Sequence, residues 1–293
     1  MAIRAFRRAD AKALAQLSAT CARTESDFVL NPLFESEAEF FAEFERHGAS
    51  PESHVLVAET GGEILGLTGY LHRPPASAAG MLCPIVAKAE RGKGIGGELL
   101  RAGLGLGAGL GIKLVTAAVG TRNRAGFALL TGSGFRPVRQ HFLMRCDQAP
   151  QAEKLPVRGL ELDAAKPADA EAILALYHAC GFDARTAEGM RELMADGRHV
   201  HAVARLGGRV AAFAELETHW PERVWVSFVG VESGLRAKGV GSALVAWAVA
   251  RRFEAGTRSA LLLLSPANRT ALRAYEKVGF RRHRVVDVLE KGI

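Results

Sequence analysis

Residues 231–242 read VESGLRAKGVGS, and the glycine loop Arg236-Ala-Lys-Gly239-Val-Gly241 lies at their centre. The apolar run 224–231 before this loop predicts a strand, and residues 241–253 after it carry apolar side chains at helical spacing. The first N–H groups of a helix lack partners within the helix and lie at the positive end of its dipole. Because glycines let a bulky anion approach these groups closely, the segment suits a pyrophosphate.

The same loop occurs 145 residues earlier as Arg91-Gly-Lys-Gly94-Ile-Gly96. Further along, Asn123-Arg124 matches Asn268-Arg269 at the same separation. Between residues 86–136 and 231–281, 12 of 51 aligned positions are identical, mostly at glycines and polar residues. Because hydrophobic patterning alone would produce apolar matches, duplication of a whole domain is the better explanation.

We therefore predict two domains, 1–147 and 157–293, joined by a linker, 148–156, that contains two prolines and shows no periodicity. Predicted strands cover 54–59, 63–71, 80–87 and 113–119 in the first domain and 158–162, 199–205, 209–217, 224–231, 260–264 and 280–289 in the second. Predicted helices cover 95–110, 241–253 and 268–277, and another follows a cap at Asp169. Glycines occupy every second position from 103 to 111, so this helix should be the softer one.

Composition excludes several classes of protein. The chain has 293 residues and a net charge of +7, divided evenly as +3 for residues 1–147 and +4 for 148–293. An even spread of charge favours a solvated surface over a nucleic-acid site. No run is long and apolar enough to span a membrane, no secretory signal is visible, and the four cysteines are scattered. These features predict a cytoplasmic protein without a zinc site or disulfide framework.

Two other phosphate-binding patterns fit poorly. Gly92, Gly94 and Gly97 satisfy the dinucleotide fingerprint, but no acidic residue occurs between Glu98 and Asp147 to hold a ribose. The second copy has Ala237 in place of the first of these glycines, and neither copy supplies the lysine and hydroxyl of a Walker A loop.

The combined pattern, the 236–241 loop followed by Asn268-x-x-Ala271-x-x-x-Tyr275 and Gly279-Phe280, resembles the GNAT superfamily of acyl-CoA-dependent N-acetyltransferases. The resemblance covers both halves and implies two tandem α/β (α+β) domains. Each would be a mixed, mostly antiparallel sheet with helices on both faces. It also implies that acetyl-CoA is the cosubstrate, without a metal, and that an amine of a small molecule or peptide is the acceptor.

The resemblance assigns roles to residues of the second domain. The loop backbone would hold the pyrophosphate of coenzyme A, Val229 and Val231 would pair with the pantetheine arm beside Asn268, and Tyr275 would protonate the departing thiolate. A phenol with a pKa near ~10 suits a thiolate whose pKa is near ~8.5. The loop residues in this role are Arg236, Ala237, Lys238, Gly239, Val240, Gly241 and Ser242.

The first domain departs from this pattern, because Leu130 aligns with Tyr275 and Pro84 removes a backbone donor beside the expected pantetheine arm. We predict a catalytically degenerate domain that either keeps a coenzyme A site or has turned its cleft to a structural use. Its secondary cofactor candidates are Val86, Arg91, Lys93, Gly94, Gly96, Gly97 and Asn123.

The general base is the least defined part of the site. Many GNAT enzymes carry a carboxylate where this chain has Ser227. Glu215, Glu217 and His219 alternate along the preceding strand and so share one face, which makes Glu215 a candidate base, directly or through water. The alternative is that these are solvated polar residues near a strand end.

A rival hypothesis of a different class is a non-catalytic protein that binds or senses acyl-CoA, which Leu130 and the missing carboxylate at Ser227 would favour. The sequence leaves open the acceptor, the acyl length and the oligomeric state, which could be a monomer or a homodimer.

Overall fold

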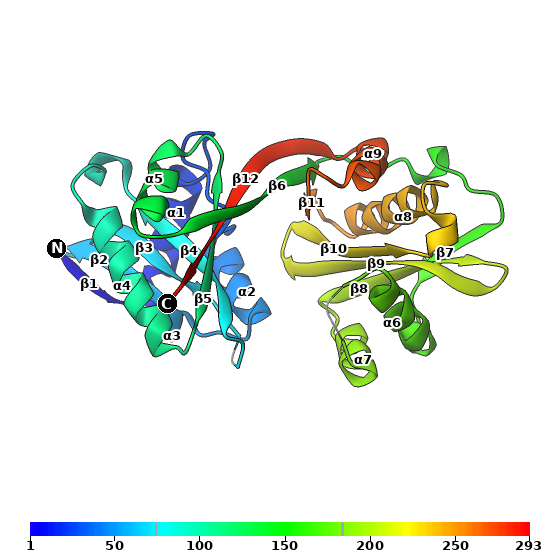
Figure 1. Ribbon diagram of the computed structural model, residues 1–293, viewed down its shortest axis with the longest axis horizontal. Coiled ribbons are helices and arrows are strands. Elements are labelled where there is room, and N and C mark those ends of the chain that lie inside the picture. The colour runs from blue at the N-terminus through cyan, green and yellow to red at the C-terminus, as the bar shows by residue number, and fades with distance from the viewer. Residues whose placement is uncertain (74, 183–184) are drawn as a thin grey trace. The chain divides into compact units, whose positions relative to one another are not determined.

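The protein is described by a computed structural model that covers residues 1–73, 75–182 and 185–293. The chain forms two compact units (Figure 1). Unit 1 consists of residues 1–141 and 284–293, and unit 2 of residues 142–283. Within the described ranges, none of the helices has the length and apolar content that crossing a bilayer requires.

Unit 1 contains a mixed sheet in the order β1-β2-β3-β4-β5-β12, followed by the first part of β6. From β1 to β12 in this order, neighbouring strands are antiparallel except for β4 and β5, which are parallel. Helices α1 and α4 pack on β3 and β4. The strands are β1 (Ala2–Ala5), β2 (Val55–Thr60), β3 (Glu63–Leu71), β4 (Ala78–Val86), β5 (Leu114–Gly120), β6 (Arg136–Cys146) and β12 (Arg281–Gly292). The helices are α1 (Ala11–Cys21), α2 (Glu37–Arg46), α3 (Pro51–His54), α4 (Ile95–Gly109) and α5 (Arg124–Gly132).

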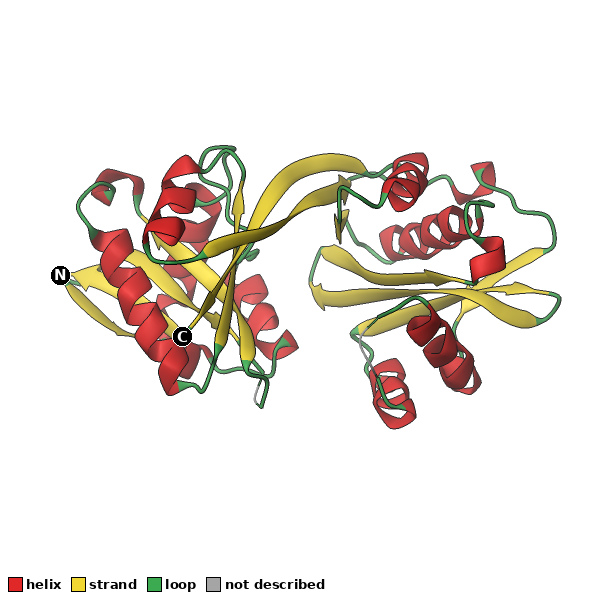
Figure 2. Ribbon diagram, viewed as in Figure 1, coloured by secondary structure: helices red, strands yellow, loops and turns green. Residues whose placement is uncertain are grey.

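Unit 2 repeats this plan in the order β6-β11-β10-β9-β8-β7, with β10 and β11 as the parallel pair. Figure 2 shows α8 and α9 on one face of this sheet and α6 and α7 on the other. The strands are β7 (Leu160–Ala164), β8 (His199–Leu206), β9 (Arg209–Trp220), β10 (Arg223–Val231) and β11 (Ser259–Leu264). The helices are α6 (Ala170–Ala179), α7 (Ala187–Ala195), α8 (Val240–Glu254) and α9 (Arg269–Val278).

The predicted fold class is confirmed, but the compact units differ from the predicted domains 1–147 and 157–293. The last strand of each sequence repeat contributes to the unit formed by the other repeat: Phe142 to Cys146 of β6 belong to unit 2 and pair with β11, and Val286 to Gly292 of β12 belong to unit 1 and pair with β5. The predicted linker, 148–156, lies within unit 2. Local patterning identifies a strand but not its partner, so the sequence could not show this exchange.

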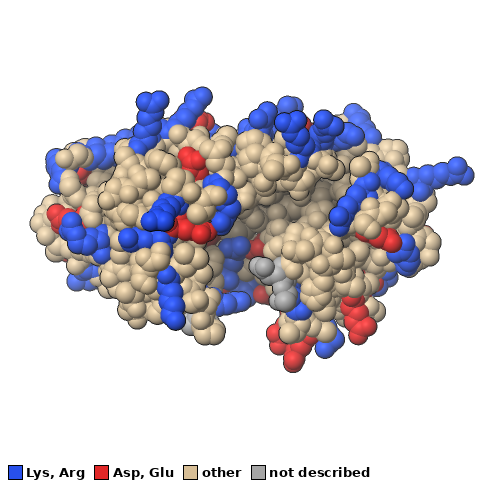
Figure 3. All heavy atoms as spheres, in the orientation of Figure 1, with Lys and Arg blue, Asp and Glu red and all other residues tan. Residues whose placement is uncertain are grey.

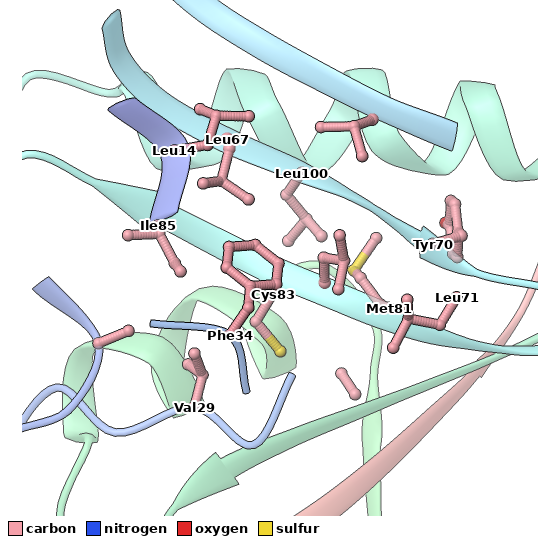
Figure 4. Close-up of a cluster of buried hydrophobic side chains, with 14 of the residues drawn as sticks. Leu14, Val29, Phe34, Leu67, Tyr70, Leu71, Met81, Cys83, Ile85 and Leu100 are labelled. Carbon is pink, nitrogen blue, oxygen red and sulfur yellow. The ribbon is translucent and has the colours of Figure 1, made fainter. Parts of the chain in front are cut away.

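Each unit has its own apolar core. Figure 4 shows part of the core of unit 1, where Val29 and Phe34 from the α1–α2 loop lie among side chains of β3 and β4 such as Leu67 and Cys83. Cys83 is 2% exposed, and burial raises the pKa of its thiol to about 11, in keeping with a structural thiol. Lys and Arg side chains occur over the visible face of both units (Figure 3), as expected from the even division of charge.

Candidate active site

The glycine loop of unit 2 makes the strand-to-helix turn that the sequence predicts. Gly239 caps α8 with φ 87°, and Val240 is the first helical residue. Ala237 has φ 61°, the one non-glycine residue with positive φ in the described parts of the chain. The matching residues of unit 1, Gly92 and Gly94, have φ 79° and 86°. The loop of unit 2 therefore keeps the backbone conformation of the unit 1 loop, although positive φ is strained for the alanine at position 237.

The side chains of this loop hold the turn in place. Arg236 Nε donates to the carbonyl oxygen of Val231 at 3.1 Å, and Arg91 Nε does the same to Val86 at 3.2 Å in unit 1. Ser242 Oγ donates to the carbonyl oxygen of Ala274 at 3.4 Å and so joins α8 to α9. A Cβ on Gly241 would lie 3.3 Å from Val231 Cγ2, which explains a small residue there.

Strands β10 and β11 separate where the cosubstrate is expected. Their parallel ladder runs only from Arg223 opposite Ser259 to Trp225 opposite Leu261. Glu232 N–H donates to Ala211 on β9, so the alternating backbone of β10 directs the N–H and C=O groups of Val229 and Val231 toward the β11 side. A bulge at Ser227 interrupts the pairing with β9 just before these residues.

Helix α9 carries the two remaining predicted residues. Asn268 caps the helix, its side chain accepting a hydrogen bond from Ala271 N–H at 3.1 Å. Tyr275 is half-buried in the core cluster that includes Val229 and Val231, with its ring 5.7 Å from that of Phe280. Burial raises the pKa of the Tyr275 phenol to about 12, so it carries its proton across the physiological range.

Glu215 is fully engaged in an ion-pair cluster. The carboxylate is 1% exposed, accepts hydrogen bonds from Arg185 at 2.6 and 3.2 Å, and lies 3.7 and 3.5 Å from ring nitrogens of His199 and His201. Burial alone would raise the pKa of Glu215, but these imidazoles and the guanidinium lower it far below its usual range. A carboxylate held this way is a weak proton acceptor.

Glu217 has a different setting, although it shares the face of β9 with Glu215. It is 7% exposed and accepts a short hydrogen bond from the hydroxyl of Ser227 across the bulge in β10. His219 Nε2 lies 4.0 Å from the Glu217 carboxylate and 3.3 Å from His199 Nε2. A carboxylate is thus placed next to Ser227, where the sequence pattern lacked one.

The region of unit 1 that matches the glycine loop, the end of β10 and the Tyr275 position of unit 2 holds a pocket of about 190 Å³. Its lining includes Pro84, Val86, Arg91, Gly96, Asn123 and Leu130. Leu130 is 1% exposed, and Asn123 is 7% exposed and caps α5 by accepting from Gly126 N–H at 2.9 Å. The remaining unit 1 candidates surround this helix start, with Lys93 Nζ 2.9 Å from Glu90 Oε1 and with Gly94 and Gly97 open to solvent on the Cβ side.

Sequence reasoning missed Arg185, His199 and His201, all of which face Glu215. The alternation of His199 and His201 along the predicted strand 199–205 was the available signal. Arg185 lies in a loop without periodicity, so only the folded chain shows its role.

Comparisons with known proteins agree with this geometry. The model of the acetyltransferase (GNAT) family matches residues 18–135 and again residues 170–280. Among solved structures, a GCN5-related N-acetyltransferase from Sphaerobacter thermophilus is 23% identical, with 99% of this chain and 95% of that chain covered and a TM-score of 0.81. A tandem GNAT protein from the clavulanic acid biosynthesis pathway is 16% identical, with 99% and 98% covered and a TM-score of 0.71. No curated protein matches the sequence.

The family model matches this chain twice. Each of the two units also carries the glycine loop and a pair of parallel strands that separate beside it. The chain belongs to the GNAT acetyltransferase family, contains two copies of its domain, and is an acetyltransferase of the kind that uses acetyl-CoA as cosubstrate.

Proposed function

We propose that unit 2 transfers the acetyl group of acetyl-CoA to an amine of a small molecule or peptide by direct attack on the thioester. The observation that carries this proposal is the gap between β10 and β11, which Val229 and Val231 face with their backbone groups. Extended ligands are held through main-chain hydrogen bonds by strand edges that have no strand beside them. The loop at Gly239, at the start of α8, would receive the pyrophosphate.

Tyr275 is the proposed general acid. Its counterpart Leu130 lines the pocket beside Val86 and Gly96 in unit 1, and the repeat gives Tyr275 the matching position beside Val231 and Gly241. When the amine attacks, the carbonyl–sulfur bond breaks and the leaving thiolate takes the phenolic proton. A phenol whose pKa is about 12 is protonated at neutral pH and becomes a stronger donor as negative charge forms on the nearby sulfur.

Replacing Tyr275 by phenylalanine tests this role. We expect kcat for the acceptor-dependent release of coenzyme A from acetyl-CoA to fall by about 10²–10⁴-fold, the usual contribution of a general acid. The Kd for acetyl-CoA and the thermal unfolding midpoint should change little, because only the hydroxyl is removed. Since burial raises the pKa of Tyr275 to about 12, the native enzyme should lose no activity through this group up to about pH 10. An unchanged rate would remove Tyr275 from the mechanism.

Glu217, with Ser227, is the better proposed route for the proton that the amine must lose. Glu215 is neutralised by Arg185, whereas Glu217 lies next to Ser227 in the bulge of β10. The acceptor would pass its proton to the Ser227 hydroxyl, which passes its own to the Glu217 carboxylate. This order leaves a neutral amine for the attack and places the proton on the Glu217 carboxyl group, which lies 4.0 Å from His219 Nε2.

The pH dependence of Glu217→Gln tests this route. A glutamine cannot accept the proton, so we expect kcat to fall by about 10²-fold at neutral pH. The loss should shrink as pH rises, by up to about tenfold per pH unit, because more of the acceptor is then already neutral in solution. Glu215→Gln is the matched control: it should lower thermal stability by breaking the pair with Arg185, and it should not produce this recovery at high pH. A pH profile of Glu217→Gln parallel to the native one would contradict the relay.

A panel of amines distinguishes catalysis from sensing. Acceptor-dependent release of the thiol supports the enzyme, and acetyl-CoA binding without release by any amine would favour the binding protein.

A further inference from the structure

A segment of unit 1 lies in the gap between its own parallel strands. The ladder of β4 and β5 runs only from Ala78 opposite Leu114 to Gly80 opposite Thr116. Beyond it, β5 pairs with residues 28–30 of the α1–α2 loop. Leu30 N–H donates to Ala118 at 2.9 Å, Gly120 N–H donates to Phe28 at 2.8 Å, and Val29 forms a bridge with Val119.

The same segment also reaches β4. Cys83 N–H, at the bulge in β4, donates to the carbonyl oxygen of Asn31 at 3.1 Å. A Cβ on Gly80 would lie 3.2 Å from the amide nitrogen of the Asn31 side chain. Residues 28–31 therefore bridge the two strands as a short additional strand would. They use Cys83 N–H of β4 and Gly120 N–H of β5, and Cys83 matches Phe228, the residue before Val229, in the repeat.

Several side chains fix this segment. Arg23 donates to the carbonyl oxygen of Val29 at 3.2 Å and to that of Phe34 at 3.3 Å. The Asn123 amide donates to Phe28 at 3.2 Å. Phe28, Val29 and Leu30 are 3%, 4% and 8% exposed, and Figure 4 shows Val29 within the apolar cluster. Arg284 from β12 places its guanidinium over the Phe28 ring, 5.5 Å from the centroid.

The mouth of the gap carries a carboxylate. Asp27 Oδ1 lies 2.9 Å from the Arg91 guanidinium on the glycine loop of unit 1. Burial alone would raise the pKa of Asp27, but hydrogen bonds from Thr24 and Arg91 lower it, so the group is ionised at neutral pH. A pyrophosphate on this loop would meet that negative charge. In unit 2 the matching Arg236 contacts the sulfur of Cys180 at 3.6 Å instead.

The loops that lead into the two gaps also differ in length. The α1–α2 loop spans residues 22–36, which are 15 residues, and the α6–α7 loop spans residues 180–186, which are seven. Among the described residues of the α6–α7 loop, which are 180–182, 185 and 186, none forms a backbone hydrogen bond with β11.

We propose that residues 28–31 are a built-in occupant of the inner end of the unit 1 cleft: they fill the space between Cys83 of β4 and residues 118–120 of β5 and shorten the pocket beside Pro84 and Val86, so that each chain binds a single acyl-CoA. This inference rests on the proposed function of unit 2 for its comparison, but the occupied gap stands on the contacts of unit 1 alone. Unit 1 is then a copy of the domain whose gap is closed at its inner end by its own chain.

Amide hydrogen exchange on the whole, ligand-free protein, resolved to single residues by NMR, tests the occupant directly. The amides of Leu30, Cys83 and Gly120 should exchange at least 100-fold more slowly than those of Val229 and Val231. Adding acetyl-CoA should slow Val229 and Val231 and leave the three amides of unit 1 unchanged. A calorimetric titration should give one acetyl-CoA per chain.

The outcomes of these measurements distinguish the built-in occupant of unit 1 from the proposed function of unit 2. Fast exchange at Leu30 and Cys83, a further slowing of these amides by acetyl-CoA, or two molecules bound per chain would each overturn the built-in occupant. Slow exchange at Leu30 and Cys83 together with no effect of acetyl-CoA at Val229 would support the occupant and overturn the proposed function of unit 2.

Discussion

The two glycine loops follow nearly the same path, but the clefts beside them differ. Gly94 and Gly239 cap their helices with φ 86° and 87°, and each loop arginine donates to the end of its strand. In unit 1 the adjacent gap pairs with the chain itself, and the position of Tyr275 is taken by a buried leucine, Leu130.

This comparison separates a signature of the fold from a signature of function. The strand-to-helix turn needs positive φ whether or not a ligand binds, so the loop persists in unit 1 beside a carboxylate and an occupied gap. The chain of unit 1 continues directly into the β6 residues that pair with β11 in unit 2. The open strand edge and the tyrosine, rather than the glycines, therefore mark the copy that we propose as catalytic.

The largest expected effect comes from placing valine at each loop glycine. Gly239→Val should weaken acetyl-CoA binding by at least about 100-fold, or ~2.8 kcal/mol, because a β-branched residue at φ 87° forces the loop from its path. Gly94→Val suffers the same backbone strain and has open space at its Cβ, so it is a matched control that should leave the Kd unchanged. Calorimetric titration measures both, and an equal loss in the two variants would contradict the asymmetry.

Sequence patterns predicted the elements of the site better than the contacts between them. The 145-residue repeat located both loops, both capping asparagines and the difference between Tyr275 and Leu130, because each depends on local residue types. The helix over 95–110 was confirmed as α4 despite its glycines.

What the sequence could not show depends on pairing between distant segments. Residues 28–31 have no periodic pattern, and their strand-like role arises only from β4 and β5. The hydrogen bond between Ser227 and Glu217 depends on a bulge that shifts the register of β10 against β9. The exchange of β6 and β12 has the same origin, since a local pattern identifies a strand but not the strand with which it pairs.

The glycine-rich helix α4 offers a smaller test of the difference between the units. A Cβ on Gly107 would lie 2.7 Å from the hydroxyl oxygen of Tyr70, a side chain with no exposed surface, and 2.9 Å from Ile293 Cδ1. We expect Gly107→Ala to destabilise the protein, because overpacking costs about 1–3 kcal/mol and the helical preference of alanine returns at most ~1 kcal/mol. Urea unfolding followed by circular dichroism checks the sign, and a gain in stability would show that α4 can move away from β3.

The smallest expected effect lies on the outer face of the same helix. Gly105 is exposed and its Cβ position has no neighbour within 4 Å, so Gly105→Ala should stabilise the protein by about 0.5–1 kcal/mol through the lower backbone entropy of the unfolded chain. The residue that matches Gly105 in α8 is Ala250, and Ala250→Gly should cost a similar amount. If the glycines make α4 the softer helix, the first change should also slow amide exchange within α4, whereas the second should speed it within α8. Equal and opposite shifts would show that the alternating glycines soften α4 through backbone entropy alone, and a loss of stability in Gly105→Ala would mean that its outer face has a neighbour in solution.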